Sequence, residues 1–541
     1  MALTDARPAA GPGDAGATAI RTTTRRDLPG LAGWLSTGSS ARIGSAYVVT
    51  SLLLVVASAV AGELVGIERG DTADLQVLGQ DVVAQVASFH AVSAVFLFVL
   101  PLFVGIATAV VPLQVGATTV AFPRAAAAAF WGWLLGSGLL VAGYLANGGP
   151  GGGDTNAVEL FVLALGMVTV SLLLGAVCVA TTVLTLRTPG LSLARVPMFS
   201  WTMLVSAVLW LLALPVFVAN LAVTWLDLHY GQAFLGGPAG VGRPIAWAFT
   251  TPTVWLYAVP ALGVVGEVVP VFSRFAQRRR NVAMAAIAVV GALGFGAYAQ
   301  PFSAVDTADQ VELSELSFVL LLPLLALVGA WADTARRGRP RPAVPLVLGG
   351  AALLLLLAGA AADALTAIDA LELRGTTWEF GTLHLVLMGG AGLAAVGALH
   401  YWLPKLWGRL LSPALGAVEA LLLLVGTLLL AAADLVSGAL DQPAGQVVGE
   451  VRDGVEALNL VSAAGGALVV LAVAVLLVDV AVRVGRRRGP LAGDDPWEGH
   501  TLEWATTSPP PPGNFADVPE VGSATPVLDR RTAAPVTPEV A

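Results

Sequence analysis

Two histidines of this sequence lie inside long apolar stretches, where an ionisable side chain is costly and marks a candidate site. His90 lies in the stretch 84–112 and His384 in the stretch 379–403. Each lies five or six residues from the start of its stretch, so two parallel helices would place both imidazoles about 8–10 Å inside the apolar layer. Two neutral imidazoles at equal depth suit the two axial positions of a low-spin haem. The alternative is two unrelated histidines, each hydrogen-bonded within a helical core.

Small residues follow the second of these histidines. The run 389–392 reads Gly-Gly-Ala-Gly, which could leave room for a flat macrocycle. His400 lies sixteen residues beyond His384, about 24 Å along a helix, so it cannot share the same iron. We expect His400 to anchor the chain at an interface, and His229 and His500 to be solvated.

The other ionisable groups are less specific. Cys178 is the one cysteine, which excludes a disulfide framework, an iron–sulfur cluster and a C-x-x-C-H haem attachment. Glu267, Glu379 and Glu419 lie within apolar stretches. They could relay protons or could face other helices or an interface.

Membrane helices must position these residues. Of 541 residues, 56% are hydrophobic and 12% are charged, and the mean hydropathy is +0.80, whereas soluble domains have about 25% charged residues. We therefore predict an all-α polytopic membrane protein embedded in the lipid bilayer, with no nucleic-acid-binding surface. Twelve stretches are long enough to cross the apolar core, which takes about 20 residues. They are residues 43–64, 84–112, 127–147, 157–185, 197–226, 245–272, 281–300, 313–334, 343–364, 379–403, 413–438 and 457–482.

The distribution of basic residues predicts the orientation. If both termini are inside, the inner segments contain 24 of the 28 Lys and Arg residues, as the positive-inside rule requires. The four in outer loops are Arg69, Arg243, Arg374 and Arg452. We therefore predict a cytoplasmic N-terminal segment (1–42), a twelve-helix domain (43–482) and a Pro-rich cytoplasmic tail (483–541), whose part from 491 onwards we expect to be extended.

Several motifs together resemble subunit I of the haem–copper cytochrome c oxidases. They are spread over nearly the whole chain: His90-Ala91-Val92, Ala121-Phe122-Pro123-Arg124, Arg187-Thr188-Pro189-Gly190, His400-Tyr401-Trp402-Leu403-Pro404-Lys405, and residues 101–105, 111–117 and 495–506. The resemblance implies a twelve-helix fold in the plasma membrane of a bacterium. It also implies a low-spin haem held by one histidine on helix II and one on helix X, which are the positions of His90 and His384.

The resemblance breaks at the family's oxygen-reducing centre. The copper histidine, proton-relay glutamate and cross-linked tyrosine of helix VI fall on Thr251, Thr253 and Trp255. The remaining losses are the two copper histidines after helix VII and the high-spin haem histidine, at Gln300, Pro301 and Thr382. The histidines that ligate two haems and a copper also outnumber the five histidines present. We expect no copper, because these residues offer neither soft nor imidazole ligands.

Other family positions have changed as well. The proton-entry aspartate after helix II and the lysine of helix VIII fall on Thr119 and Leu327. The helix I arginine falls on Ala61, and the paired arginines that hold haem propionates fall near Ala444-Gly445. These changes leave open whether the haem is of A or B type, and whether any haem is bound.

Three functions therefore stay open. The first is a membrane haem protein of aerobic respiratory electron transport, with one bis-histidine haem that carries or senses single electrons. The second is a working terminal oxidase, as the family implies, although the missing ligands argue against oxygen reduction by this chain. The third is a haem-free structural or assembly subunit. We expect other respiratory-chain membrane subunits as partners, because the chain has no copper or cysteine site for electron entry, and the donor stays unknown.

Overall fold

The computed structural model describes residues 33, 37–70, 78–231, 240–250, 253–295, 309–444 and 454–533, with the side chains of 80–81, 243–244 and 309–316 left aside. The contacts within the chain separate residues 1–37 from residues 38–541. All the helices named below belong to the second unit.

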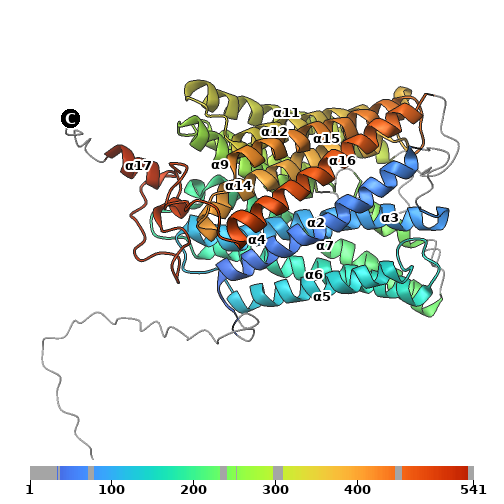
Figure 1. Cartoon of the computed structure of the whole chain (residues 1–541), viewed down its shortest axis with the longest axis horizontal. Helices are drawn as coiled ribbons and strands as arrows, with labels where there is room; N and C mark the ends of the chain where they lie inside the picture. The colour runs from blue at the N-terminus through green and yellow to red at the C-terminus, as the bar shows by residue number, and fades with distance from the viewer. Residues whose placement is uncertain are drawn as a thin grey trace, which may run out of the picture. The chain divides into compact units, whose positions relative to one another are not determined.

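Eleven helices of the described ranges are long and apolar enough to cross a membrane, and they run alongside one another as a bundle (Figure 1). They are α2 (Ser40–Arg69), α3 (Gln80–Val92) continued by η1 (Ser93–Val99) and α4 (Leu100–Val115), α5 (Pro123–Leu145), α6 (Thr155–Thr185), α7 (Met198–Tyr230), α9 (Trp255–Ser273), α11 (Asp309–Arg337), α12 (Val344–Leu365), α13 (Trp378–Leu383) continued by η5 (His384–Gly392) and α14 (Leu393–Trp407), α15 (Pro413–Ala439), and α16 (Glu456–Val480) continued by η6 (Ala481–Gly485).

The remaining elements are short: η2 (Leu193–Arg195), α8 (Gly242–Trp247), α10 (Arg280–Leu293), η4 (Asp369–Leu371), η7 (Leu502–Ala505) and α17 (Pro526–Ala533). Within the described residues the β pairing consists of two isolated bridges. The predicted all-α polytopic fold is confirmed. The span predicted at 281–300 corresponds to the shorter apolar helix α10, and residues 296–300 lie outside the described part.

Local sequence signals fix where several helices begin and end. Asp154 and Ser412 precede α6 and α15, and each side chain accepts a hydrogen bond from a main-chain N–H of the first turn, which satisfies a donor that the helix leaves unpaired. Gly116 and Gly408 follow α4 and α14 with φ of 73° in both cases, a left-handed conformation that glycine adopts at no steric cost. The two glycines thus end the segments that contain His90 and His384.

Three of the spans form the centre of the bundle. Of the most apolar window in each span, 94% of residues are buried in Val82–Val115, 100% in Trp255–Ser273 and 78% in Trp378–Trp407, against 22% in Glu456–Gly485. His90 and His384 belong to the first and third of these. Both histidines therefore lie on central helices of the bundle.

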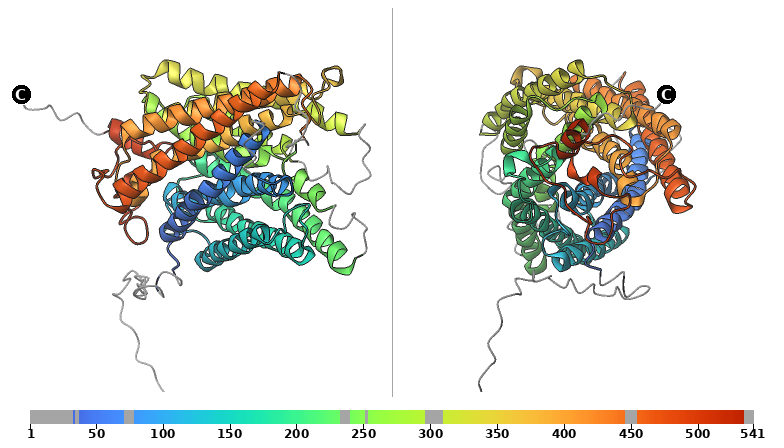
Figure 2. Two further views of the ribbon diagram at one scale, coloured as in Figure 1. Left: turned by 45° about the vertical axis from the view of Figure 1, so that its right-hand side comes forward. Right: turned by 90° about the vertical axis from the view of Figure 1, so that its left-hand side faces the viewer.

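The segment after α16 is not the extended tail that we expected from 491 onwards. Residues 490–533 pack across one end of the bundle, as the end-on view in Figure 2 shows. Trp504 is buried, and the indole of Trp497 donates to the carbonyl of Tyr401 at 2.9 Å. Aromatic side chains gain free energy from such burial, which explains why the segment folds. We call it the cap and this end of the bundle the cap end; the other is the far end.

Candidate haem-binding site

His90 is held by the neighbouring helix α2. Its Nδ1 lies 2.8 Å from the carbonyl oxygen of Ser58, and the Ser58 hydroxyl donates to the carbonyl of His90 at 3.2 Å. A carbonyl only accepts hydrogen bonds, so Nδ1 of the neutral ring carries the proton and Nε2 keeps a free lone pair. The Ser58 carbonyl thereby selects the tautomer that can ligate a metal through Nε2.

A glycine on α2 allows this close approach. A Cβ atom placed on Gly62 would lie 2.6 Å from both Cε1 and Nδ1 of His90, closer than real carbon contacts come. Any larger residue at position 62 would displace the imidazole. The absence of a side chain at Gly62 is therefore what allows the His90 ring to pack against α2.

His384 is held by a carboxylate of α15. Its Nδ1 lies 3.0 Å from Oδ2 of Asp434, and the other carboxylate oxygen lies 3.0 Å from the guanidinium of Arg69 at the end of α2. The side chain of Asp434 is 1% exposed and that of His384 is 24% exposed. The Asp434 carboxylate is thus an ion-pair contact of Nδ1, and it leaves Nε2 as the ligating atom.

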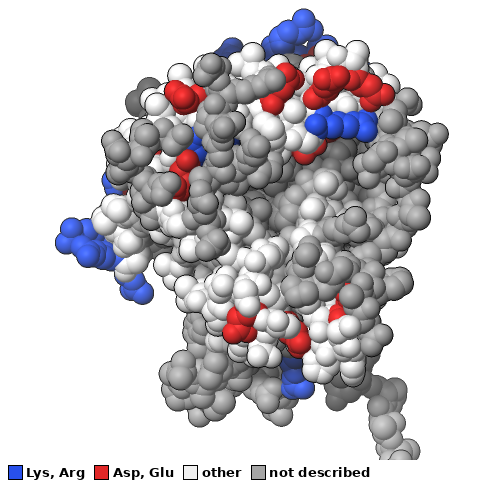
Figure 3. Space-filling model, turned by 90° about the vertical axis from the view of Figure 1, so that its right-hand side faces the viewer, with Lys and Arg blue, Asp and Glu red and all other residues white. Residues whose placement is uncertain are grey.

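The contacts of Arg69 and Asp434 join four helices at the far end. Arg69 lies over the ring of Phe380 on α13 at 5.6 Å, and its carbonyl accepts from Asn459 on α16 at 2.8 Å. Ser462, also on α16, donates to Asp434 Oδ1 at 3.4 Å. At the surface of this end, acidic side chains and fewer basic ones are scattered among uncharged residues (Figure 3). Arg69, whose side chain is 12% exposed, supplies the cation that compensates Asp434.

Both histidines adjoin a stretch of π-helix. His90 lies three residues before η1, and His384 is the first residue of η5. The two π-helical stretches contact each other, and α2 contacts both α3 and η1. Such widened turns concentrate at functional sites because they re-aim side chains within a helix. The structure thus places both predicted ligands at the far end, on neighbouring central helices.

This donor set fits a bis-histidine haem. Two imidazoles with Nδ1 facing an acceptor and Nε2 available are the ligands that such an iron needs. The expected room beside the glycine run is absent, however. Cβ atoms on Gly389 and Gly390 would lie 2.9 Å and 2.3 Å from side-chain atoms of Leu355 and Leu356. These glycines serve the close packing of η5 against α12, so the expectation about the run 389–392 was wrong.

The other three histidines have different surroundings. Nε2 of His400 lies 3.1 Å from Oε2 of Glu419 on α15, and both side chains are buried, so His400 is not an interfacial anchor. His229 lies in the last turn of α7, contacts Glu159 and is 47% exposed, in line with the expected solvation. His500 is 4% exposed, which contradicts the expectation. Burial, followed by the charge of Arg531, lowers the pKa of His500 to about 4.

Some residues at the changed family positions use their polar atoms within the helices. Thr382 donates to the carbonyl of Trp378 at 3.1 Å. The indole of Trp255 donates to Asp363, with a 3.5 Å separation, and Ser317 donates to the same carboxylate oxygen at 2.7 Å.

Of six further changed family positions, three are described by the structure and three are not. Thr253 is buried with its hydroxyl unpartnered among the described residues, Leu327 is fully buried, and Thr119 lies 3.4 Å from the carbonyl of Gly38. Thr251, Gln300 and Pro301 lie outside the described residues.

The two predicted relay carboxylates not yet placed have local structural partners. Glu267 Oε1 accepts from the main-chain N–H of Phe199 at 3.0 Å, and Glu379 Oε1 accepts from that of Gly375 at 3.0 Å. Sequence reasoning missed Asp434, although the rule that selected Glu419 in the same predicted span applies equally to Asp434. Arg69 was counted as a topological charge alone, and Gly62 carries no distinguishing signal among 61 glycines.

The fold and the site define a polytopic helical membrane protein whose central helices present two histidines with Nε2 available. The family model for cytochrome c and quinol oxidase polypeptide I matches residues 42–468. The chain belongs to this family, which is haem-containing and works in respiratory electron transport within multi-subunit complexes.

Individual relatives agree with that assignment. A putative cytochrome c oxidase subunit 1-beta of Streptomyces coelicolor is 30% identical, over 95% of this chain and 93% of its own length. Cytochrome c oxidase subunit 1 of Bacillus subtilis is 28% identical, over 82% of this chain and 74% of its own. A heme-copper oxidase subunit I+III of Aeropyrum pernix is 28% identical, over 90% of this chain and 62% of its own.

Proposed function

We propose that this chain is a subunit I-like membrane protein that binds one low-spin haem through Nε2 of His90 and His384 and does not itself reduce oxygen. The observation that carries the proposal is that an acceptor faces Nδ1 of each histidine. When held there by His90 and His384, the haem would supply one-electron transfer.

The chain's own residues orient the ligands. The Ser58 carbonyl and the Asp434 carboxylate fix the two tautomers, while Gly62 lets the ring of His90 lie against α2. The surrounding spans are central. A rigid seat lowers the reorganisation that accompanies a change in charge.

The proposed loss of oxygen reduction rests on residue chemistry at the family's active-site positions. A second haem would need a proximal ligand, and Thr382 stands at that position with its hydroxyl donating to Trp378. Trp255 has no ionisable hydroxyl to replace the tyrosine, and threonine does not store a proton near neutral pH. Several separate requirements fail together, so one compensating residue would not restore turnover.

A haem-free structural or assembly subunit is the second candidate. The observation that favours it is the absence of the family's propionate-binding arginines at Ala444-Gly445 and of the helix I arginine at Ala61. Under either function we propose other respiratory membrane subunits as partners, since this chain has no copper or cysteine site for electron entry.

Metal analysis and optical spectra of the purified chain decide between these functions. We expect about one haem per chain, no stoichiometric copper, and a reduced-minus-oxidised spectrum that carbon monoxide leaves unchanged. The position of the reduced band also identifies the haem as A or B type. Copper near one per chain, or sustained cyanide-sensitive oxygen uptake in vesicles lacking another haem–copper subunit, would contradict the proposal. Absence of haem would favour the structural subunit.

We also propose that both termini are cytoplasmic in a bacterial plasma membrane, as the charge bias favours. The single cysteine, Cys178, is buried, so a cysteine introduced near either end can be probed with an impermeant thiol reagent. Labelling of intact cells at those positions would contradict this orientation.

A further inference from the structure

We propose that Asp434 is a positioning residue for the iron ligand His384, and that Arg69 holds Asp434 in place for that role. The inference rests on the proposed function, because it concerns the same haem. It gives a role in haem binding to Asp434 and Arg69, neither of which is among the changed family positions.

The geometry gives each oxygen of Asp434 a separate task. Oδ2 lies 3.0 Å from Nδ1 of His384, and Oδ1 lies 3.0 Å from the guanidinium of Arg69. The backbone at this point is also fixed, because the carbonyl of Asp434 accepts from Thr377 at 3.0 Å and from Ser437 at 3.2 Å. The carboxylate therefore cannot turn away from His384 without breaking its contact with Arg69.

The chemistry of a carboxylate explains why the residue type matters. An ionised carboxylate only accepts hydrogen bonds, so it selects the tautomer with the proton on Nδ1 and leaves Nε2 for the iron. It also raises the basicity of the imidazole as a ligand. A stronger donor favours the oxidised iron, so the carboxylate lowers the midpoint potential of the haem.

Arg69 makes the buried carboxylate tolerable. The Asp434 side chain is 1% exposed, and a buried charge without a partner is strongly destabilising. The opposite charges of Arg69 and Asp434, whose atoms lie 3.0 Å apart, compensate each other within the pair. Arg69 therefore acts on the iron ligand through Asp434 and not by direct contact with His384.

The same helices contain a matched control. Glu419 of α15 contacts His400 of α14 as Asp434 contacts His384, and both carboxylates are almost fully buried. The Glu419 contact runs through Nε2, the ring nitrogen that a ligand would need. A Glu419→Gln variant thus removes a buried carboxyl group from the same helix without touching the proposed iron ligand.

The test uses the full-length chain purified in detergent, in four variants: Asp434→Asn, Asp434→Glu, Arg69→Gln and Glu419→Gln. Haem content, midpoint potential and the low-temperature EPR g-values of the oxidised form are measured for each. We expect Asp434→Asn to weaken haem binding about 10- to 100-fold and to raise the potential of the haem that stays bound. Asp434→Glu should restore part of both, Arg69→Gln should shift both in the direction of Asp434→Asn, and Glu419→Gln should shift neither.

The outcomes separate this inference from the proposed function. Wild-type haem content, potential and g-values in Asp434→Asn would overturn the inference and leave the bis-histidine proposal standing. A wild-type chain without haem would overturn both. If Asp434→Asn does not survive purification, Arg69→Gln decides, because it keeps the carboxylate, and an unchanged potential there overturns the role of Arg69. Equal shifts in Glu419→Gln would show a general effect of buried charge and would also overturn the inference.

Discussion

Two histidines on one membrane-spanning segment each contact a carboxylate of α15, but they use different ring nitrogens. At the far end, His384 faces Asp434 through Nδ1, and near the cap end, His400 faces Glu419 through Nε2. The first contact leaves Nε2 of His384 available, whereas the second occupies Nε2 of His400. A buried histidine–carboxylate pair is therefore not in itself the mark of a metal ligand; the nitrogen that remains available decides.

The surroundings of the two histidine–carboxylate pairs also differ, in a way that favours a ligand at His384 and not at His400. Arg69 adds a cation to the His384 pair, and η5 widens the helix at that point. The His400 pair is closed in by its neighbours, since a Cβ on Gly416 would lie 2.7 Å from Cε1 of His400. The cap covers the nearby end of the bundle. The far end therefore leaves a ring nitrogen available to a ligand, whereas the cap end is closely packed around its histidine.

The strongest way to break this comparison is to remove the rings themselves. His90→Ala and His384→Ala should each abolish the low-spin haem spectrum, because a bis-histidine iron needs both axial ligands. His400→Ala should leave that spectrum intact, since its Nε2 already contacts Glu419. Reduced-minus-oxidised spectra of the three purified variants give the answer. A normal spectrum in either of the first two would refute the axial assignment.

A second comparison concerns the two glycines that face the rings. Gly62→Ala should displace His90, at an overpacking cost of about 1–3 kcal/mol, which corresponds to a loss of haem affinity of about 5- to 150-fold. Gly416→Ala crowds His400 to a similar degree and should lower thermal stability without lowering haem content. Haem titration and thermal unfolding of both variants measure this. Equal loss of haem in the two would remove the distinction between the ends.

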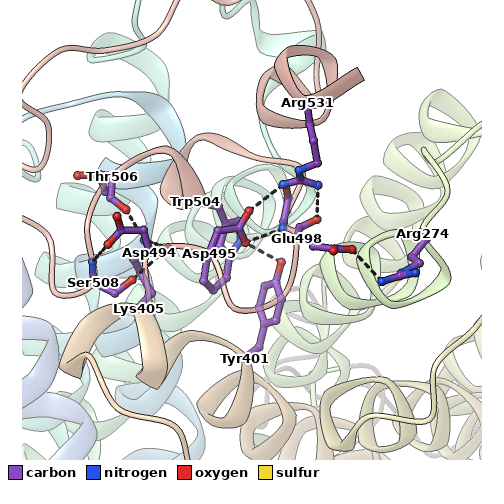
Figure 4. Close-up of polar contacts among 11 residues, drawn as sticks. Arg274, Tyr401, Lys405, Asp494, Asp495, Glu498, Trp504, Thr506, Ser508 and Arg531 are labelled. Atoms are coloured by element: carbon purple, nitrogen blue, oxygen red, sulfur yellow. Dashed lines mark hydrogen bonds and ion pairs between the residues drawn. The ribbon is translucent and has the colours of Figure 1, made fainter. Parts of the chain in front are cut away.

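The cap end offers a test in which only packing should respond. Lys405 donates to the carbonyls of Asp494 and Thr506, each at 2.7 Å, and lies over the ring of Trp504 (Figure 4). Lys405→Met should cost about 1–3 kcal/mol, because it leaves buried carbonyls unpaired. Limited proteolysis should then cleave the cap faster while the haem spectrum stays unchanged. Protection equal to wild type would show that the cap does not depend on this lysine.

The smallest expected effect is a dependence of the cap on pH. The pKa of His500 is lowered to about 4 by burial and by Arg531, against about 6.5 in an unfolded chain. Between these values the unfolded cap binds a proton that the folded cap does not, so its free energy of unfolding falls as the pH falls. Burial raises the pKa of Asp495 and Glu503, which acts in the opposite direction.

The difference between wild type and His500→Gln isolates this contribution. Cleavage of the cap should increase more between pH 7 and pH 5 in the wild type than in the variant, because the variant has no imidazole to protonate. An identical dependence on pH in both proteins would contradict the assignment to His500.

Sequence patterns predict the framework well because hydropathy and charge act over whole helices. They also single out His90 and His384, since an ionisable group within an apolar span is conspicuous by itself. Gly62 and Arg69 are different, because their roles depend on which helices become neighbours. Asp434 was visible in its span, yet its partner was not. The cap was misjudged because a polar, Pro-rich composition hides the few side chains, such as Trp504, that become buried.

The spacing of the two carboxylates along α15 has a geometrical consequence. Glu419 and Asp434 are fifteen residues apart, and the histidines that they contact are sixteen apart on the antiparallel neighbour. Inserting one residue between the carboxylates would rotate one by about 100° relative to the other, so both contacts could not form together. The two carboxylates of α15 therefore fix the axial position of the neighbouring segment. Substitutions between residues 419 and 434 are compatible with both contacts, but insertions and deletions are not.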